Sequence, residues 1–409
     1  MYHSLTHSSS RSMRALCALI AAACSATATR THTGQPHLLL IISDQFRAEA
    51  LTIAGNRAVR TPSLDWLAAT GARFTRHYSS TPTCTPARAA ILTGRSPWGH
   101  GMLGYGEVAR SYANHSLELG GALHAAGYYT ASIGKNHFEC GKNDTRYAHG
   151  FDRTLVYDGL GTGFPDTPSP GDYDDYDAWF AAATGGADPL ATGEPQLDWN
   201  SWRGAPYIYD EALHPTAWTG SAGVAFVKEM AARGADAPPF FLKLSFHRPH
   251  SPYDPPARLL NATLAEQLPL VHAGGNWDTM FKGPNAWCGP QNVDAWCGEM
   301  PVTDAEVSRR AYYAGISFVD EWIGAVVRAL NETDALNNTM IVFTSDHGDG
   351  LGDHYHWRKG YPYESTANGE STLVMSTRDL TRIATPNKRD TIPLSVIPLS
   401  RSAPHSSVA

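Results

Sequence analysis

Two apolar segments that end abruptly in acidic residues place the strongest constraint on the fold of this chain of 409 residues. HLLLIISD brings Asp44 directly after a run of aliphatic residues, and TMIVFTSDHGD brings Asp346 to the same position far downstream. A short, continuous apolar run without polar alternation is typical of a strand that is buried on both faces of a parallel sheet. The sequence therefore predicts two such strands, each with a carboxylate at its carboxyl end.

Strand-like and helical patterns alternate along the chain. YYTASIGKNH and PFFLKLSFHRPH predict two further strands, the first ending in Lys135 and His137 and the second in His250. TPSLDWLAATG predicts a helix with Thr61 as the N-cap and Pro62 in the first turn. SLELGGALHAAG and TDAEVSRRAYYAGISFVDEWIGAVVRAL predict two more helices. This alternation indicates an α/β fold, with a mixed, mostly parallel sheet sandwiched by helices.

The overall composition agrees with a globular fold. Hydrophobic residues make up 42% of the chain and charged residues 17%, which is enough apolar material for a sizeable core. The 32 Lys and Arg residues against 39 Asp and Glu residues give a net charge of −7. A nucleic-acid-binding protein needs a basic face, so we expect no nucleic-acid partner.

The first residues have the pattern of a secretory signal peptide. Two arginines precede the apolar stretch ALCALIAAAC, and small residues at Ala26 and Ala28 follow it as in an A-x-A cleavage site. The apolar stretch is too short to cross a bilayer. We therefore predict a signal peptide over residues 1–28 and an extracellular or lysosome-like protein without a stable membrane span.

Cysteines and glycosylation sequons fit the same compartment. Cys288 and Cys297 each lie in an AWCG segment within a Gly-, Asn- and Pro-rich loop, which suits a local disulfide. Cys84 and Cys140 could form a second pair. N-glycosylation is expected at the Asn-X-Ser/Thr sequons that begin at Asn114, Asn143, Asn261, Asn331 and Asn337.

Residues 161–200 form a Gly-, Pro- and Asp-rich segment that also contains several aromatic residues. Long loops without regular structure are uncommon in compact domains and are often functional. We expect an insertion that shapes the rim of a pocket, with its acidic residues on a solvated face.

Potential metal ligands follow the two acidic strand ends. Asp44 and Gln45 follow the first apolar run, and Asp346 and His347 follow the second. Because ligands bind beyond the carboxyl ends of parallel strands, we expect these side chains at one edge of the sheet. Such oxygen-rich sets suit Ca2+, Mg2+ or Mn2+ better than tetrahedral zinc. An ordinary polar turn after each strand is the simpler alternative.

The segment CTPARAAILTGR places Cys84 at the expected start of a helix. Pro86 suits the first helical turn, and Arg88 returns a cation toward the same end one turn later. Backbone N–H groups and the helix dipole favour negative charge at such a position. An anion-binding helix start beside a divalent cation indicates phosphate or sulfate esters as ligands.

These residues resemble the signature of the sulfatase family, within the alkaline-phosphatase-like superfamily. The Cys-x-Pro-x-Arg core runs from Cys84 to Arg88, and LTGR follows it from Leu92 to Arg95. IISDQFRAEAL, GKNHF, RPHSPYDPP and SDHGDGLGDHYHWRKG also match the family in order and spacing, over roughly residues 37–365. The resemblance implies the family's fold and the hydrolysis of sulfate monoesters by an arylsulfatase or carbohydrate sulfatase type of enzyme. It also implies a sulfated small molecule or glycan as the substrate.

The resemblance further implies a modified cysteine and a bound metal. In the family the signature cysteine is oxidised to formylglycine (3-oxoalanine) by the formylglycine-generating enzyme, and the hydrated aldehyde is the nucleophile. Carried over, this role falls to Cys84. The hydrate would hold the metal together with Asp44, Gln45, Asp346 and His347, with Ca2+ favoured over Mn2+ or Mg2+.

The catalytic residues that the resemblance implies are Cys84, Arg88, Lys135, His137, His250 and Lys359. Arg88 and Lys135 would stabilise the hydrate and the sulfate charge. His137 would be the base that releases sulfate from the enzyme. His250 and Lys359 would bind sulfate and protonate the leaving oxygen. The neighbouring His247 is expected to support the pocket, and Arg47 is a candidate for substrate contact.

Two departures from the family pattern leave alternatives. Gln45 stands where many sulfatases have a second Asp, as in relatives that cleave phosphonate monoesters or phosphodiesters, which are the alternative substrates. After KGYPYES the family pattern is lost, although STLVMST is strand-like. We therefore expect a catalytic domain over residues 29–372, a divergent tail over 373–409 and a truncated C-terminal subdomain. An inactive, glycan-binding relative is the third hypothesis.

Overall fold

The computed structural model describes residues 34–104, 118–137, 149–159, 174–189, 191, 197, 200–272, 288–290, 292, 294–369 and 371–374. Several features expected from the sequence lie outside these residues. They are the signal peptide, the sequons at Asn114 and Asn143, Cys140, the first part of the 161–200 segment, and the chain beyond residue 374.

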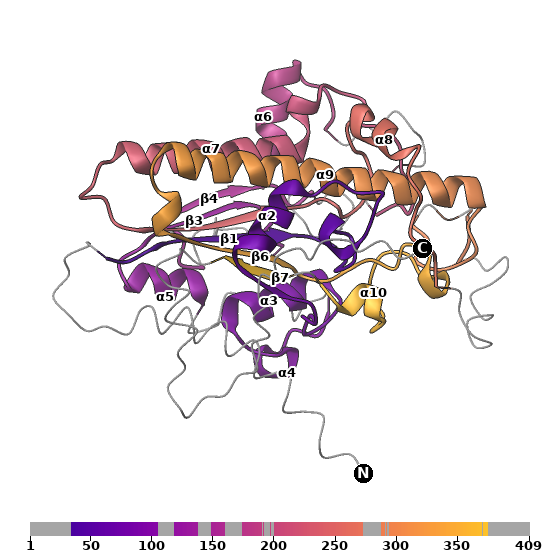
Figure 1. Ribbon diagram of the computed structural model, residues 1–409, viewed down its shortest axis with the longest axis horizontal. Helices are drawn as coiled ribbons and strands as arrows, with labels where there is room; N and C mark the ends of the chain where they lie inside the picture. Colours follow the sequence, from indigo (N-terminus) through magenta and orange to yellow (C-terminus); the bar gives the residue numbers. More distant parts are fainter. Residues whose placement is uncertain are drawn as a thin grey trace, which may run out of the picture.

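A mixed sheet of seven strands forms the centre of the described part of the chain (Figure 1). The strand order is β2-β7-β6-β1-β5-β3-β4. β4, β3, β5, β1 and β6 are parallel neighbours, whereas β7 pairs antiparallel with both β6 and β2. The mostly parallel sheet predicted from the sequence is therefore confirmed. The strands are β1 His37–Ser43, β2 Ala72–Phe74, β3 Tyr129–Gly134, β4 Arg153–Val156, β5 Phe240–Phe246, β6 Thr339–Ser345 and β7 Ser371–Val374.

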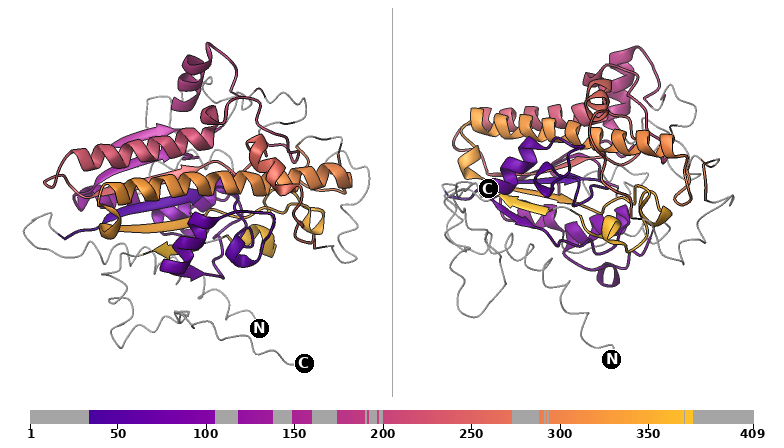
Figure 2. Two further views of the ribbon diagram at one scale, coloured as in Figure 1. Left: turned by 45° about the horizontal axis from the view of Figure 1, so that its top comes forward. Right: turned by 45° about the vertical axis from the view of Figure 1, so that its right-hand side comes forward.

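Helices cover both faces of this sheet, as expected (Figures 1 and 2). α7 and α9 run side by side over one face with α2 against α9, and α3 and α5 lie on the other face. The helices are α2 Pro62–Thr70, α3 Cys84–Thr93, α4 Pro97–His100, α5 Leu119–Ala125, α6 Asp175–Thr184, α7 Pro215–Ala232, α8 Ala257–Thr263, α9 Val302–Glu332 and α10 Glu364–Ala367. Short 3-10 turns are η1 Thr52–Ala54, η4 Glu211–Leu213, η6 Leu336–Asn338 and η7 Asp353–Tyr355.

The position of the central strand β1, between two layers of helices, explains why its sequence is apolar throughout. Leu39 and Ile41 belong to the core under α7 and α9, whereas Leu38 and Leu40 belong to the core on the α3 side. Successive side chains of a strand point to opposite faces, so a strand covered on both sides needs apolar residues at nearly every position. This double burial fixes the end of β1 and therefore the place of Asp44.

The start of α2 is bonded differently from the expectation. Thr61 occupies the N-cap position, but its hydroxyl bonds to Asp65 and caps no N–H of the first turn. The N–H groups of Ser63 and Leu64 donate instead to the two carboxylate oxygens of Asp320 in α9, at 2.9 and 2.7 Å. Asp320 is buried, and burial raises its pKa to about 6.

Asp320→Asn is expected to change how stability depends on pH. The pKa of Asp320 is raised from an ordinary value of 3.8 to about 6, so the folded state binds this proton more tightly than the unfolded state. Its contribution to stability is therefore lost as the pH rises through that window. Between about pH 4 and about pH 7, the free energy of unfolding of the wild type should fall by roughly 2–3 kcal/mol relative to D320N. Urea unfolding of both proteins checks this, and a pH-independent difference would contradict it.

The disulfide predicted from the repeated AWCG segments is present between Cys288 and Cys297. The sequons at Asn261, Asn331 and Asn337 have exposed asparagines. Within the residues that the structure describes, no helix is long and apolar enough to span a membrane.

Candidate active site

The candidate site lies at the carboxyl edge of the sheet, beside the first turn of α3. Asp44 directly follows β1, Asp346 and His347 directly follow β6, and Cys84 is the first residue of α3. β1 and β6 are parallel and paired along their whole length, which brings their carboxyl ends together. The sheet edge predicted from the sequence is therefore the place where these side chains meet.

A cluster of buried side chains forms a candidate metal centre. The ligand atoms of Asp44, Cys84, Asp346 and His347 lie within 4.8 Å of one another. The Cys84 sulfur lies 3.1 Å from Nε2 of His347 and 3.6 Å from a carboxylate oxygen of Asp44. Nδ1 of His347 bonds to the carbonyl of Gly348 at 2.9 Å, which leaves Nε2 facing the cluster. Two carboxylates, an imidazole and the group at position 84 suit a divalent cation.

Gln45 lies beside this cluster, and its amide connects two other polar groups. Its Nε2 donates to Asp349 at 2.5 Å, and its Oε1 accepts from Nζ of Lys359 at 3.0 Å. The backbone of Gln45 is left-handed, with a φ of 67°, and is held by bonds to the Tyr312 hydroxyl and to Asp346. The structure thus places Gln45 next to the candidate metal centre, and its amide oxygen holds Lys359 there.

Arg88 ties the two carboxylates of the metal centre together. Its Nε donates to Asp346 at 2.8 Å, and one terminal nitrogen lies 3.3 Å from Asp44. The other terminal nitrogen donates to the carbonyl of Lys135 and to the hydroxyl of Ser245, at 2.9 Å each. The guanidinium is therefore directed at buried protein acceptors, and it acts on the site by balancing the carboxylate charge.

Cations surround the Cys84 thiol. Nζ of Lys135 lies 2.6 Å from Asp44, and the His137 side chain bonds to Cys84. Burial alone would raise the pKa of the Cys84 thiol, but the charges of Lys359, His347 and Lys135 outweigh it, and the pKa lies well below its ordinary value. The site therefore favours a negative charge at position 84.

His250 comes from the turn after β5. Its Nδ1 bonds to the carbonyl of Ser251 at 2.7 Å, and its ring also bonds to Cys84. Burial, followed by the charges of Lys359 and Lys135, lowers the pKa of His250 to about 3, so the imidazole is neutral in this site. The buried His247 packs edge-on against the His250 ring, with centroids 4.7 Å apart, in keeping with a supporting role.

Asp349, which the sequence analysis did not single out, is a buried hub of the site. Its carboxylate accepts from Gln45, from the Tyr253 hydroxyl at 2.7 Å, and from the backbone N–H groups of Leu351 and Arg358 at 2.8 and 2.9 Å. Its signal in the sequence was the second acid of SDHGD, which falls outside the strand and resembles an ordinary turn residue.

Arg47 was a candidate for substrate contact, but its side chain is buried and pairs with carboxylates of the protein. That expectation is therefore wrong. Its guanidinium donates to Asp353 at 2.8 Å and to the carbonyl of Gly350 at 3.1 Å, and it also pairs with Glu49. These bonds fix the loop that follows Asp349. A guanidinium engaged in this way is not available to a substrate.

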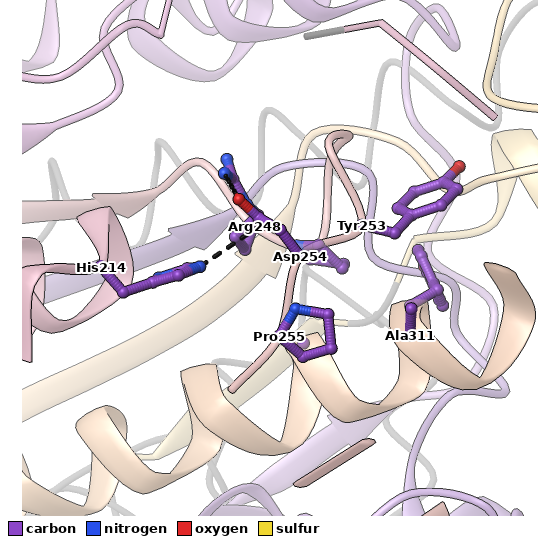
Figure 3. Close-up of a pocket in the computed structure, with 9 residues that line it drawn as sticks. His214, Arg248, Tyr253, Asp254, Pro255 and Ala311 are labelled. Carbon is purple, nitrogen blue, oxygen red and sulfur yellow. Dashed lines mark hydrogen bonds and ion pairs between the residues drawn. The ribbon is translucent and has the colours of Figure 1, made fainter. Parts of the chain in front are cut away.

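A small pocket beside the His250 turn is too small for a substrate (Figure 3). Its volume of about 10 Å³ is close to that of a single water probe. Arg248 donates two bonds to Asp254 at its wall, at 2.6 and 2.8 Å, and His214 lies 3.4 Å from the same carboxylate. The Arg248–Asp254 ion pair supports the turn that carries His250.

The fold and the candidate metal centre together place the chain among the alkaline-phosphatase-like α/β proteins. The Sulfatase family model matches residues 36–372, which is most of the chain. The chain therefore belongs to the sulfatase family, as the sequence signature implied.

Individual relatives agree with this assignment. The arylsulfatase of Clostridium perfringens is 36% identical over 341 residues, which cover 81% of this chain and 67% of that protein. The choline-sulfatase of Rhizobium meliloti is 30% identical over 355 residues, which cover 82% of this chain and 62% of that protein. This chain thus spans about two thirds of the length of these relatives.

A solved structure shows the same fold. The phosphonate monoester hydrolase of Agrobacterium radiobacter superposes with a TM-score of 0.63 at 23% identity, covering 83% of this chain and 68% of that chain. This match of the whole fold confirms the predicted fold class, in addition to the strand order of the sheet.

Proposed function

We propose that the chain hydrolyses sulfate monoesters, with an aryl or sugar alcohol as the leaving group. The observation that carries this proposal is the position of Cys84, which lies within the candidate metal centre at a helix start, beside the cations of Lys135 and Lys359. Fixed positive charge of this kind stabilises the negative charge that develops on transferring oxyanions. The relatives named arylsulfatase and choline-sulfatase support sulfate esters as the substrate class.

The proposed nucleophile is a formylglycine made from Cys84, and the proposed cofactor is one divalent cation. When bound, the hydrate and the cation supply an activated hydroxyl and the polarisation of sulfate oxygens. The ligand atoms of Asp44, Asp346 and His347 converge on position 84, which supports this pairing. We propose Ca2+ as the cation, with Gln45 as a further oxygen ligand and Mn2+ or Mg2+ as alternatives.

Lys135 and His137 have proposed roles on the nucleophile side of the site. Lys135 lies 2.6 Å from Asp44 and, together with Arg88, balances the charge of the centre and of the bound sulfate. His137, which bonds to position 84, is the base that takes up a proton as sulfate leaves.

His250 and Lys359 have the proposed role of proton donors to the leaving oxygen. His250 must first gain a proton, because its pKa is about 3 under the influence of burial and two neighbouring cations. An anionic ester bound beside Lys359 and Lys135 would offset their charge and raise the pKa of His250. Substrate binding is therefore expected to shift the pKa of His250 upwards, toward the range that a proton donor needs.

One feature keeps phosphonate monoesters and phosphodiesters as a second substrate class: the neutral amide of Gln45 beside the candidate metal centre resembles the residue that relatives cleaving such esters have there. A carboxylate in its place would add a negative charge to the centre. Phosphodiesters and phosphonate monoesters carry the same single negative charge as a sulfate monoester, so charge alone does not separate them. The two substrate classes are distinguished by comparing kcat/KM for para-nitrophenyl sulfate with kcat/KM for bis-para-nitrophenyl phosphate. A ratio below one would favour the second class.

The first test is the mass of the tryptic peptide that spans residues 77–88, from protein secreted by a eukaryotic host. Conversion of Cys84 to formylglycine replaces the thiol with an aldehyde, which lowers the peptide mass and allows trapping with a hydrazide. An unmodified thiol, from a host that modifies other sulfatases, would contradict the proposed nucleophile. The inactive-relative hypothesis would then be tested by glycan binding that persists in C84A.

Removal of the metal is expected to lower stability as well as activity. A cation that binds only the folded state stabilises it by about 2.7 kcal/mol at a hundredfold excess over its Kd. Chelator-treated protein should therefore unfold at a lower temperature and recover most with Ca2+. Thermal unfolding with each ion in turn checks this expectation.

Two variants make the metal test specific. D346N is expected to lose the response to added ions, because Asp346 belongs to the cluster. D353N is the matched control from the same loop, since its carboxylate pairs with Arg47. Recovery of D346N to the same extent as D353N would place the ion elsewhere.

The remaining proposals concern maturation. We propose removal of residues 1–28 as a signal peptide, passage through the secretory pathway with N-glycosylation, and modification by a formylglycine-generating enzyme. The proposed catalytic domain covers residues 29–372, and 373–409 form a divergent tail. Endoglycosidase treatment and N-terminal sequencing of the secreted protein test these proposals.

A further inference from the structure

The turn after β3 carries two of the proposed catalytic side chains, Lys135 and His137. One buried carboxylate, that of Asp158, accepts from the backbone N–H groups of two consecutive residues of this turn. Its Oδ1 lies 2.6 Å from the N atom of Asn136 and 2.9 Å from that of His137. Asp158 follows β4, the neighbour of β3, and is 7% exposed.

The conformation of this turn needs such support. His137 has a φ of 52°, in the left-handed region, which costs a residue other than glycine on the order of 1–3 kcal/mol. On the other side of the turn, Nζ of Lys243 donates to the carbonyl of Lys135 at 3.0 Å and to Oδ1 of Asn136 at 2.7 Å. The turn is thus bonded through its backbone from two sides, and Asp158 is the group that bonds to His137 itself.

Asp158 is held in turn by the segment that the sequence analysis interpreted as a solvated rim. Asp174, the N-cap residue of α6, is buried and accepts from the N–H groups of Asp158 at 2.7 Å and Gly159 at 3.0 Å. Asp175 accepts from the N–H of Val156 at 2.7 Å. The expectation of solvated acidic residues is therefore wrong for Asp174, because its carboxylate replaces water as the acceptor for backbone N–H groups.

We propose that Asp158 is a positioning residue for catalysis, which fixes the Asn136–His137 backbone so that the His137 imidazole is directed at position 84. The proposal rests on the proposed function for its kinetic part. Asp158 bonds to the backbone of the turn, and the His137 side chain is one of the groups that bond to Cys84. Because small misplacements of a catalytic group cost large factors in rate, Asp158 should act on kcat without contributing to substrate affinity.

The kinetic test compares three variants with para-nitrophenyl sulfate as the probe. D158A is expected to lower kcat by about 10- to 100-fold with KM changed by less than about threefold. D158N keeps an oxygen that can accept both N–H groups, and it should retain kcat within about threefold. D152A is the matched control, because Asp152 accepts from the N–H of Thr130 at 2.8 Å at the opposite end of β3. It should leave kcat within about twofold of the wild type.

A second readout does not depend on turnover. Hydrogen–deuterium exchange should show faster exchange of the Asn136 and His137 amides in D158A, and of the Thr130 amide in D152A. If the wild type carries the aldehyde but hydrolyses no ester, the proposed function fails, and the exchange measurement still decides whether Asp158 holds the turn.

Defined outcomes would overturn the inference. They are a kcat of D158A equal to that of D152A, a kcat of D158N as low as that of D158A, or unchanged exchange at Asn136 and His137. Should D158A fail to fold, D158E decides, since it keeps the charge but displaces the carboxylate by one methylene. A drop in kcat of tenfold or more in D158E supports the inference, and a smaller change overturns it.

Discussion

Cys84→Ala is expected to lower kcat/KM for an aryl sulfate by on the order of 10³-fold or more. The substitution removes the thiol that is converted to the proposed aldehyde, and the methyl group of alanine cannot undergo the same conversion. The site would retain the carboxylates of Asp44 and Asp346, His347, and the surrounding cations. Steady-state kinetics on para-nitrophenyl sulfate measure the loss, and thermal unfolding in the same buffer shows that the variant is folded.

The matched control for this loss lies at the other end of the same helix. The Thr93 hydroxyl bonds to the carbonyl of Ala89 within α3, at 2.7 Å, and Thr93→Ala is expected to keep kcat/KM within about twofold. If C84A retained a tenth of the wild-type activity, the group at position 84 would not be the nucleophile. The metal centre would then act on water directly.

Arg88→Met is expected to lower the free energy of unfolding of the metal-free protein by about 3–5 kcal/mol. Arg88 is 1% exposed and bonds to both Asp346 and Asp44, so its removal leaves two buried carboxylates with one counter-charge fewer. Methionine has a similar length, which keeps the loss of packing small. A loss of this size is a large share of the 5–15 kcal/mol that typically stabilises a folded protein. Urea unfolding in the presence of a chelator provides the measurement.

Arg258→Met is the control that shows how much of the loss in stability comes from the burial of the ion pair and how much from the pairing itself. Arg258 also bonds to two carboxylates, those of Glu211 and Glu321, but its side chain is 47% exposed. Exposed ion pairs contribute little, so this variant should lose about 1 kcal/mol or less. Equal losses in the two variants would mean that Arg88 does not balance the charge of the metal centre.

Three residues of the candidate metal centre, Asp44, Asp346 and His347, could be predicted to meet because they follow buried strands. Asp44 and Asp346 end continuous apolar runs, and the carboxyl ends of adjacent parallel strands meet by geometry. The same argument predicted the position of His347. Cys84 was predicted separately, from the sulfatase signature at the start of a helix. The four central strands β1, β3, β5 and β6 followed from apolar runs, and α2, α5 and α9 from helix patterns, which is why the fold class was predictable, whereas β2, β4 and α7 were not predicted.

The groups that hold the site in place could not be predicted in this way. Asp158, Asp174 and Asp349 act through bonds to backbone N–H groups or to other side chains, and such acceptors have no periodic pattern in the sequence. The start of α2 gives the same lesson. A local rule assigns its cap to Thr61, whereas the acceptor is Asp320, which is 257 residues away from Ser63 along the chain.

The complete burial of Cys84 sets a time limit on its proposed modification. Cys84 is 0% exposed, so a modifying enzyme needs the chain before the site closes. His347, which closes against it, lies 263 residues further along the chain. Ribosomes add roughly 5–20 residues per second, so the signature segment emerges on the order of tens of seconds before β6 can pair with β1. Slower synthesis of the intervening chain would lengthen this interval, and premature docking of α3 would shorten it.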